Sequence, residues 1–188
     1  GLARLPAPAD AVAFARGIRD PEGHPVSTPS GKIEIYSMAI AANPDPYGLG
    51  TISPIPTWVP EPADPKHPLR LVTPKSRART HSIHDNQVVL ARADRDDVWV
   101  HPDDAAARGI ADGQRVAVFN DRGRTLIPAR ITDRVARGVV SIKEGAWFSL
   151  DASGQDTRGC SNLLTPDLSS PAGATPFNSC FVEIEPAG

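Results

Sequence analysis

The chain has 188 residues, with 22 acidic and 20 basic side chains and a formal net charge of −2. This charge argues against a nucleic-acid-binding protein, which usually needs a strongly basic surface. No apolar run approaches the roughly 20 residues of a membrane-spanning helix, so we expect no direct membrane insertion. The sequence begins at Gly1 and its single methionine is Met38, which suggests a piece of a longer protein.

Residues 1–68 are predicted to form an N-terminal extension that bridges domains. A short helix is expected over residues 9–18, and the alternation of polar and apolar residues over 32–36 predicts a half-buried strand. Ser37 is expected to cap a brief helix that ends near residue 42. Residues 43–68 are rich in proline and are expected to form a long ordered linker.

Residues 69–188 are predicted to form a mainly β domain with short helices. A short helix is expected over residues 101–109, because acidic residues come first and glycine comes last. Pro128 lies inside one predicted strand and suggests that this strand is at a sheet edge. Short strands with regular turn punctuation are typical of a small barrel, and they are expected at 69–72, 98–100, 115–119, 125–131, 138–142 and 181–185.

The segment after the first of these strands is the strongest candidate for ligand binding. Thr73, Lys75 and Ser76 follow the strand directly, and His81 and Ser82 come a few residues later. Hydroxyl groups, backbone N–H groups and a lysine at a strand end are suited to a phosphate-bearing ligand. An imidazole can also donate a hydrogen bond to a pyrophosphate or a heterocycle.

Other kinds of chemistry have little support in the sequence. His81 and His84 have a spacing that suits one helical face, but no further His or Cys lies nearby to complete a metal site. His84 and Asp85 are predicted to be solvent-facing turn residues. The sequence contains no nucleophile elbow, no glycine-rich dinucleotide fingerprint and no P-loop.

A second polar segment, Gly-Cys-Ser-Asn-Leu-Leu-Thr, occupies residues 159–165. Asn162 has donor and acceptor groups suited to the edge of a heterocycle, and Thr165 adds a hydroxyl. The alternative is a packed turn in which Asn162 bonds its own backbone. Cys160 and Cys180 are too few for a structural zinc site or an iron–sulfur cluster. They are interpreted as small buried side chains, with a disulfide or a reactive thiol as alternatives.

The order of apolar residues, helix, glycine and Asp-Gly turn over residues 98–118 resembles the double-psi β-barrel of the aspartate decarboxylase-like fold. Four segments also resemble the C-terminal molybdopterin dinucleotide-binding domain of dimethyl sulfoxide reductase-family catalytic subunits. They are Leu-Arg-Leu-Val-Thr-Pro-Lys-Ser-Arg-Ala-Arg-Thr-His-Ser at 69–82, Glu-Gly-Ala-Trp at 144–147, the segment at 159–165, and Thr-Pro-Ser-Gly-Lys-Ile-Glu at 28–34.

This resemblance implies a function in oxygen-atom transfer coupled to two electrons. The implied cofactor is bis(molybdopterin guanine dinucleotide) with molybdenum or tungsten, bound mainly with upstream domains of the same catalytic subunit. The metal ligand would also lie upstream, so the chain alone is expected to be inactive and to carry no cofactor. The implied cofactor contacts, carried over by matched position, are Thr73, Lys75, Ser76, His81, Ser82, Asn162 and Thr165.

Further partners implied by the resemblance are iron–sulfur electron-transfer and membrane-anchor subunits, on the periplasmic or cytoplasmic side of a prokaryotic membrane. The alternative function is a non-enzymatic protein- or peptide-binding double-psi barrel. It would need an exposed apolar groove in place of the Thr/Lys/Ser/His loop. A self-processing decarboxylase would need a Gly-Ser cleavage site, and residues 69–188 contain no Gly-Ser pair.

Overall fold

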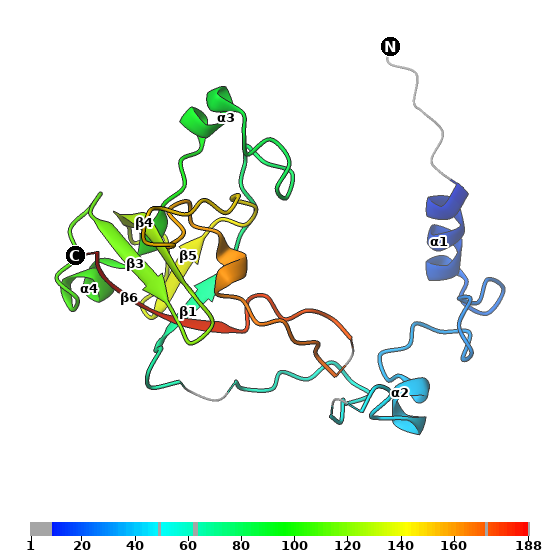
Figure 1. Ribbon diagram of the computed structural model, residues 1–188. Helices are drawn as coiled ribbons and strands as arrows, with labels where there is room; N and C mark the ends of the chain where they lie inside the picture. Colours follow the sequence, from blue (N-terminus) through cyan, green and yellow to red (C-terminus); the bar gives the residue numbers. More distant parts are fainter. Residues whose placement is uncertain (1–8, 49, 62–63, 172, 188) are drawn as a thin grey trace, which may run out of the picture. The chain divides into compact units, whose positions relative to one another are not determined.

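The computed structural model describes residues 9–48, 50–61, 64–171 and 173–187. The chain divides into an N-terminal unit, residues 1–59, and a barrel unit, residues 60–188, and each is described by itself (Figure 1). Within the described residues, no helix is both long enough and apolar enough to cross a membrane.

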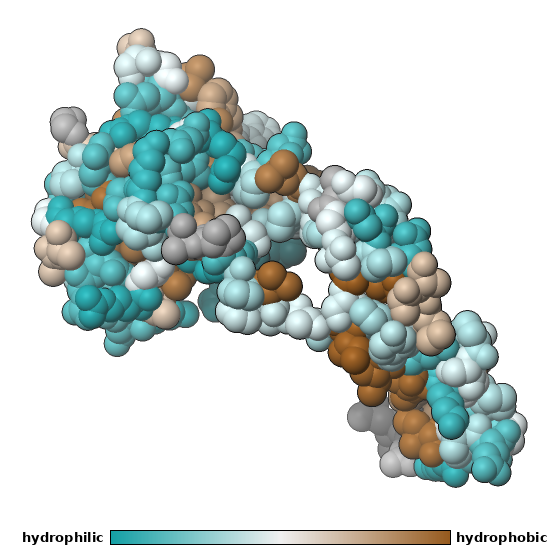
Figure 2. All heavy atoms as spheres, turned by 90° about the horizontal axis from the view of Figure 1, so that it is seen from below, coloured by the Kyte–Doolittle hydropathy of each residue, from teal (hydrophilic) through white to brown (hydrophobic). Residues whose placement is uncertain are grey.

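The N-terminal unit contains two helices, α1 (Ala9–Arg19) and α2 (Met38–Ala42). The predicted cap of α2 is confirmed, because the backbone N–H of Ile40 donates to the Ser37 hydroxyl oxygen at 3.3 Å. Apolar side chains lie at the surface of this unit (Figure 2). Phe14, Ile18 and Ile33 are among those that line a hollow of about 530 Å³.

The strand predicted over residues 32–36 is wrong. The backbone there is irregular, and the side chains of Ile33 and Ile35 are 71% and 74% exposed. The carbonyl oxygen of Lys32 accepts from the Thr28 hydroxyl at 2.6 Å. An alternating pattern forms a strand only beside a partner strand, and no described residue pairs with this segment.

Six strands of the barrel unit close into a barrel in the order β1-β5-β2-β4-β3-β6. This confirms the predicted mainly β fold with a double-psi barrel, and the predicted strands agree with the observed ones within two residues. Their bounds are β1 (Leu69–Val72), β2 (Val98–Val100), β3 (Arg115–Phe119), β4 (Arg124–Ile131), β5 (Val139–Ile142) and β6 (Cys180–Pro186).

The core fills the inside of the barrel, because alternate residues of each strand point inward. Leu69 and Leu71 of β1 are buried, while Arg70 and Val72 between and after them are half-buried. Burial alternates in the same way along β2, β4 and β6. The inward-facing residues include Val98, Val100, Val116, Val118, Ile127, Val140, Ile142, Cys180, Val182 and Ile184.

The prediction that Pro128 marks an edge strand is wrong, because a closed barrel has no edge. Pro128 is the last residue of β4 that pairs with β3, opposite Arg115. The next residue, Ala129, pairs with Val98 of β2. The missing N–H of proline therefore falls where β4 changes partner.

Strand direction decides which connections share an end of the barrel. β1 and β5 are parallel, β2 and β4 are parallel, and the β1·β6, β2·β5, β3·β4 and β3·β6 pairs are antiparallel. The ends of β1, β3 and β5 therefore lie beside the starts of β2, β4 and β6. We call this end the rim. Its connections are rim loop 1 (73–97), rim loop 2 (120–123) and rim loop 3 (143–179).

Each long rim loop contains a short helix that the sequence did not predict, α3 (Val88–Ala93) in rim loop 1 and η1 (Ser161–Leu163) in rim loop 3 (Figure 1). The predicted helix after β2 is confirmed as α4 (Pro102–Ala106), at the opposite end of the barrel. There the His101 imidazole accepts from the Asp103 N–H at 3.2 Å.

Candidate functional site

The residues predicted to contact a ligand all lie at the rim. Five belong to rim loop 1 and two to rim loop 3, although about 80 positions separate the two groups in the sequence. The parallel pairing of β1 with β5 is what brings these loops to one end. They are Thr73, Lys75, Ser76, His81, Ser82, Asn162 and Thr165.

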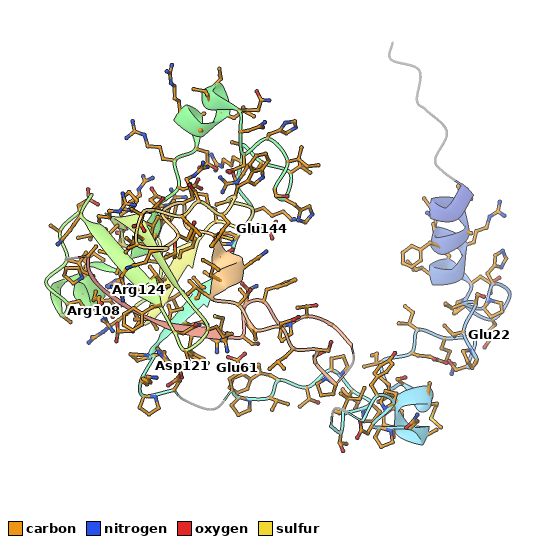
Figure 3. All side chains as sticks on the ribbon, in the orientation of Figure 1. Glu22, Glu61, Arg108, Asp121, Arg124 and Glu144 are labelled. Carbon is orange, nitrogen blue, oxygen red and sulfur yellow. The ribbon has the colours of Figure 1, made fainter. Side chains whose placement is uncertain are left out.

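The side chains of Lys75 and His81 both lie close to the carboxylate of Glu144, the second residue after β5. The Lys75 Nζ donates to Glu144 Oε1 at 2.9 Å and lies 3.2 Å from His81 Nε2, while His81 Nδ1 lies 3.3 Å from the same carboxylate oxygen. The side chains of Lys75 and His81 are 65% and 72% exposed. Figure 3 labels Glu144 on rim loop 3. Glu144 is not among the site residues predicted from the sequence.

The backbone around His81 is held in an uncommon conformation. His81 has a φ of 53°, in the left-handed region that side chains rarely adopt. Gly145 approaches so closely that a Cβ there would lie 1.9 Å from the His81 carbonyl oxygen. The Trp147 Nε1–H donates to the Ser82 carbonyl oxygen at 2.7 Å. The start of rim loop 3 therefore fixes His81 and Ser82 and leaves their side chains exposed.

Thr73 and Ser76 lie deeper in the rim. The Thr73 N–H donates to Asn178 Oδ1 at 3.0 Å, which connects the end of β1 to the start of β6. Ser76 is buried and its hydroxyl donates to Asp94 Oδ2 at 2.7 Å. Burial alone raises the pKa of Asp94, but the Lys143 ammonium at 2.6 Å and the Ser76 hydroxyl outweigh it and hold that pKa below its usual range.

Asn162 lies in η1 and its carboxamide is exposed. It has no side-chain hydrogen bond within the described residues, so the alternative of a bond to its own backbone is not seen there. Thr165 is half-buried, and its N–H donates to Ser161 O at 3.2 Å. Rim loop 2 fixes this segment, because Asn120 Nδ2 and Arg122 Nε each donate to Leu164 O at 2.9 Å.

Asp85 was predicted to face solvent, and this is wrong because tertiary contacts bury it. Its side chain is 1% exposed. Its oxygens accept from Arg79 Nη1 and Arg158 Nη2, each at 2.9 Å, and from the Trp147 N–H at 3.0 Å. Arg79 belongs to rim loop 1, whereas Arg158 and Trp147 belong to rim loop 3. Asp85 therefore connects the two loops.

Arg79 is the second centre of this network and is also buried. It makes a two-pronged contact with Asp96, at 3.0 and 2.8 Å, and donates to Glu144 O at 3.2 Å. Burial alone lowers the pKa of the Arg79 guanidinium, but Asp96 and Asp85 outweigh this effect and raise that pKa. We call Arg79, Asp85, Asp96 and Arg158 the rim network. The sequence signal for it was the density of charged residues in rim loop 1.

Asp156 attaches rim loop 3 to the barrel wall. Its carboxylate accepts from the Thr125 hydroxyl of β4 at 2.7 Å, and from the N–H groups of Ser149 and Cys160 at 3.0 and 2.8 Å. Burial alone raises the pKa of Asp156, but these hydrogen bonds favour the charged form and lower it below its usual range.

Both cysteines are free thiols, so the disulfide alternative is not seen. Cys180 is fully buried, as predicted, whereas Cys160 is half-buried. Burial raises the pKa of both thiols. Among the residues that the structure describes, no cluster of three or more His, Cys, Asp or Glu side chains could hold a metal ion.

Residues 69–181 match the family model of the "Molydopterin dinucleotide binding domain". The chain therefore belongs to the molybdopterin dinucleotide-binding domain family, and the resemblance found in the sequence is confirmed. The matched range covers β1 to β5, the first two residues of β6 and both long rim loops.

Curated relatives include sulfoxide and N-oxide reductases. The chain is 40% identical over 184 residues to dimethyl sulfoxide reductase DmsA of Escherichia coli, with 93% of the chain and 23% of the relative covered. It is 38% identical to biotin sulfoxide reductase of Cereibacter sphaeroides, with 98% and 26% covered. It is 37% identical to trimethylamine-N-oxide reductase of Haemophilus influenzae, with 93% and 22% covered. The chain thus spans about a quarter of the length of these relatives.

Among solved structures, the chain is similar to acetylene hydratase from Pelobacter acetylenicus, with a TM-score of 0.71 and 20% identity. The alignment covers 89% of this chain and 25% of that structure. This likeness supports the barrel fold alone.

Proposed function

We propose that this chain is the cofactor-binding domain of a larger oxidoreductase subunit that reduces a sulfoxide or an N-oxide. The observation that carries the proposal is the meeting of the polar segments of rim loops 1 and 3 at one end of a barrel of this family. The names of the curated relatives support the reaction class. The remaining parts of the catalytic subunit would supply the substrate pocket.

The exposed groups at the rim are of the chemical types that can bind a pterin dinucleotide. Lys75 and His81 can bind anionic oxygens. The Ser82 hydroxyl and the Asn162 carboxamide are exposed and have no partner within the described residues, so they are free to bind a heterocycle edge. Thr165 lies beside Asn162 in sequence and is half-buried.

Ser76 and Thr73 fit such a ligand less directly. The Ser76 hydroxyl is engaged with Asp94, and the Thr73 hydroxyl lies 3.4 Å from Asn178 Oδ1. We propose that both shape rim loop 1, which in turn presents Lys75 and His81. Glu144 is the one acidic side chain of the exposed cluster, and Lys75 offsets its charge.

The proposed cofactor is bis(molybdopterin guanine dinucleotide) with molybdenum, and tungsten is the alternative metal. When bound, it supplies two-electron oxygen-atom transfer. The residues of this chain would bind it and orient it: Lys75, which shares its charge with Glu144, and His81 would each donate a hydrogen bond, and the rim network would keep the two loops together. We place the metal ligand in another part of the subunit, so the chain alone would show no reductase activity.

Two further proposals concern organisation. Residues 1–68 would contact other domains of the subunit, although residues 60–68 belong to the barrel unit, where Glu61 pairs with Arg70. Iron–sulfur and membrane-anchor subunits would supply electrons, as the family resemblance implies.

The test is cofactor retention in the full-length parent enzyme. His81→Ala is compared with His84→Ala, which removes another exposed imidazole of the same loop that also has a positive φ. We expect the pterin release rate to rise about tenfold in His81→Ala, since a hydrogen bond to a charged group contributes about 1.5 kcal/mol, and to stay within twofold in His84→Ala. Asn162→Ala should behave like His81→Ala.

Release is measured by the fluorescence of the oxidised pterin, together with the metal content. Equal release from His81→Ala, His84→Ala and the parent enzyme would contradict the assignment of the rim as the cofactor site.

A further inference from the structure

A cavity of about 400 Å³ lies on the outer face of the barrel, between rim loop 1 and the β4–β5 connection at the opposite end. Its walls come from rim loop 1, β2, β4 and the end of β5, together with Arg134 of the β4–β5 connection. The charged side chains that line it are five cations and one carboxylate: Lys75, Arg77, Arg130, Arg134, Lys143 and Asp94.

The single carboxylate of this lining is already neutralised. Asp94 Oδ1 accepts from the Lys143 ammonium at 2.6 Å, and Oδ2 accepts from the Ser76 hydroxyl and from the Arg77 N–H at 2.7 and 3.0 Å. The Lys143 and Asp94 side chains are 14% and 18% exposed, so this pair forms the inner wall of the cavity. Asp94 therefore offers no free charge that would repel an anion.

Two guanidinium groups of the lining have no carboxylate partner among the described residues. Arg77 has only its backbone N–H engaged. Arg134 lies over the Trp99 ring at 4.8 Å, and Arg130 lies over the same ring at 5.1 Å. Arg130 comes no closer than 3.9 Å to Asp97. The planar fork of a guanidinium matches the oxygens of a phosphate, and stacking on an aromatic ring limits its motion before binding.

We propose that this cavity is a binding site for a phosphate-bearing anion, with Arg77 and Arg134 as the groups that contact it. Lys75 lines the cavity and also belongs to the cluster with His81 and Glu144. One source of the phosphates is therefore the diphosphate of a dinucleotide whose pterin lies at His81. The other source is a free phosphate compound. Only the first source rests on the function proposed above.

The site is tested on the 188-residue chain by calorimetric titration with inorganic pyrophosphate at low ionic strength. Arg77→Gln and Arg134→Gln should each weaken binding about tenfold, which corresponds to about 1.4 kcal/mol. Arg92→Gln and Arg137→Gln are the matched controls, because both arginines are exposed in the same two connections and do not line the cavity. The controls should stay within twofold of the parent chain.

Absence of pyrophosphate binding, or equal weakening by the control variants, would overturn the proposal. A second measurement, dinucleotide release from the full-length parent enzyme, separates the two sources. Faster release from Arg134→Gln than from Arg137→Gln assigns the cavity to the cofactor diphosphate, and equal release with impaired pyrophosphate binding assigns it to a free phosphate compound. If pyrophosphate binds as expected while His81→Ala retains its pterin, the cavity stands and the proposed pterin site fails.

Discussion

Replacing Asp85 by asparagine should destabilise the barrel unit strongly. The substitution keeps the size of the side chain and removes the charge that Arg79 and Arg158 share. It also presents an amide donor to groups that are themselves donors. Because Asp85 is 1% exposed, water cannot replace the lost interactions.

The contacts indicate a loss of about 2–3 kcal/mol in the free energy of unfolding. Removing one partner of a buried ion pair costs about 3–5 kcal/mol when the other charge is left alone. Arg79 keeps its two-pronged contact with Asp96, which reduces that cost. Arg158 is 39% exposed, so its contact with Asp85 contributes at most about 1 kcal/mol.

Urea denaturation of the 188-residue chain, followed by far-UV circular dichroism, measures this loss. With a slope of about 1.5 kcal/mol per molar urea, the midpoint should fall by about 1.3–2 M. Asp167→Asn is the control, because Asp167 is exposed and has no partner within the described residues. A midpoint for Asp85→Asn within about 0.3 M of the control would refute the view that the rim network holds the loops together.

Three further predictions concern rim loop 3. In urea denaturation, Gly145→Ala should lower the free energy of unfolding by about 1–3 kcal/mol more than Gly154→Ala does. Both glycines have positive φ, but only a Cβ at Gly145 would collide with the His81 carbonyl oxygen. Equal losses would count against this contact. The pKa of Asp156 is lower in the folded chain than in the unfolded chain, so its carboxylate stabilises the fold at pH values above the ordinary aspartate pKa of about 4. This contribution disappears as the pH falls through the lower pKa of the folded state. Asp156→Asn should therefore reduce the drop in urea midpoint between pH 6 and pH 3, and an unchanged drop would contradict the prediction. Burial raises the pKa of Cys160, so a thiol reagent at pH 7.5 should label it much more slowly in the native chain than in urea, whereas equal rates would argue against its burial.

The strands of the barrel could be predicted from the sequence because the pattern of apolar residues within each segment indicates a strand. Residues 98–100 and 139–142 are short apolar segments bounded by polar residues or glycine, and in the barrel they point alternate side chains into one core. Residues 32–36 have the alternating pattern of a half-buried strand and form no strand, because no described segment pairs with them. Periodicity shows that a segment can form a strand, and the availability of a partner decides whether it does.

The proposed ligand-binding groups could be predicted by residue type, whereas the residues that hold them in place could not. Lys75 and His81 stand out by chemistry next to a strand end. Glu144 reaches Lys75 and His81, and Arg158 reaches Asp85, only because β1 and β5 run parallel, and that pairing is set by the closure of the whole barrel. Asp85 looked like a turn residue because its main partners are side chains whose positions depend on the fold.

The direction of β6 has a practical consequence for experiments. The strand starts at the rim with Cys180 and ends six residues later at Pro186, beside the start of β3. At about 3.3 Å per residue, Pro186 lies about 20 Å from the level of Cys180. A fluorophore or an immobilisation tag attached after Pro186 would therefore be carried by the end of the barrel opposite the binding groups, and a sensor surface could hold the domain there while leaving the rim open to ligand.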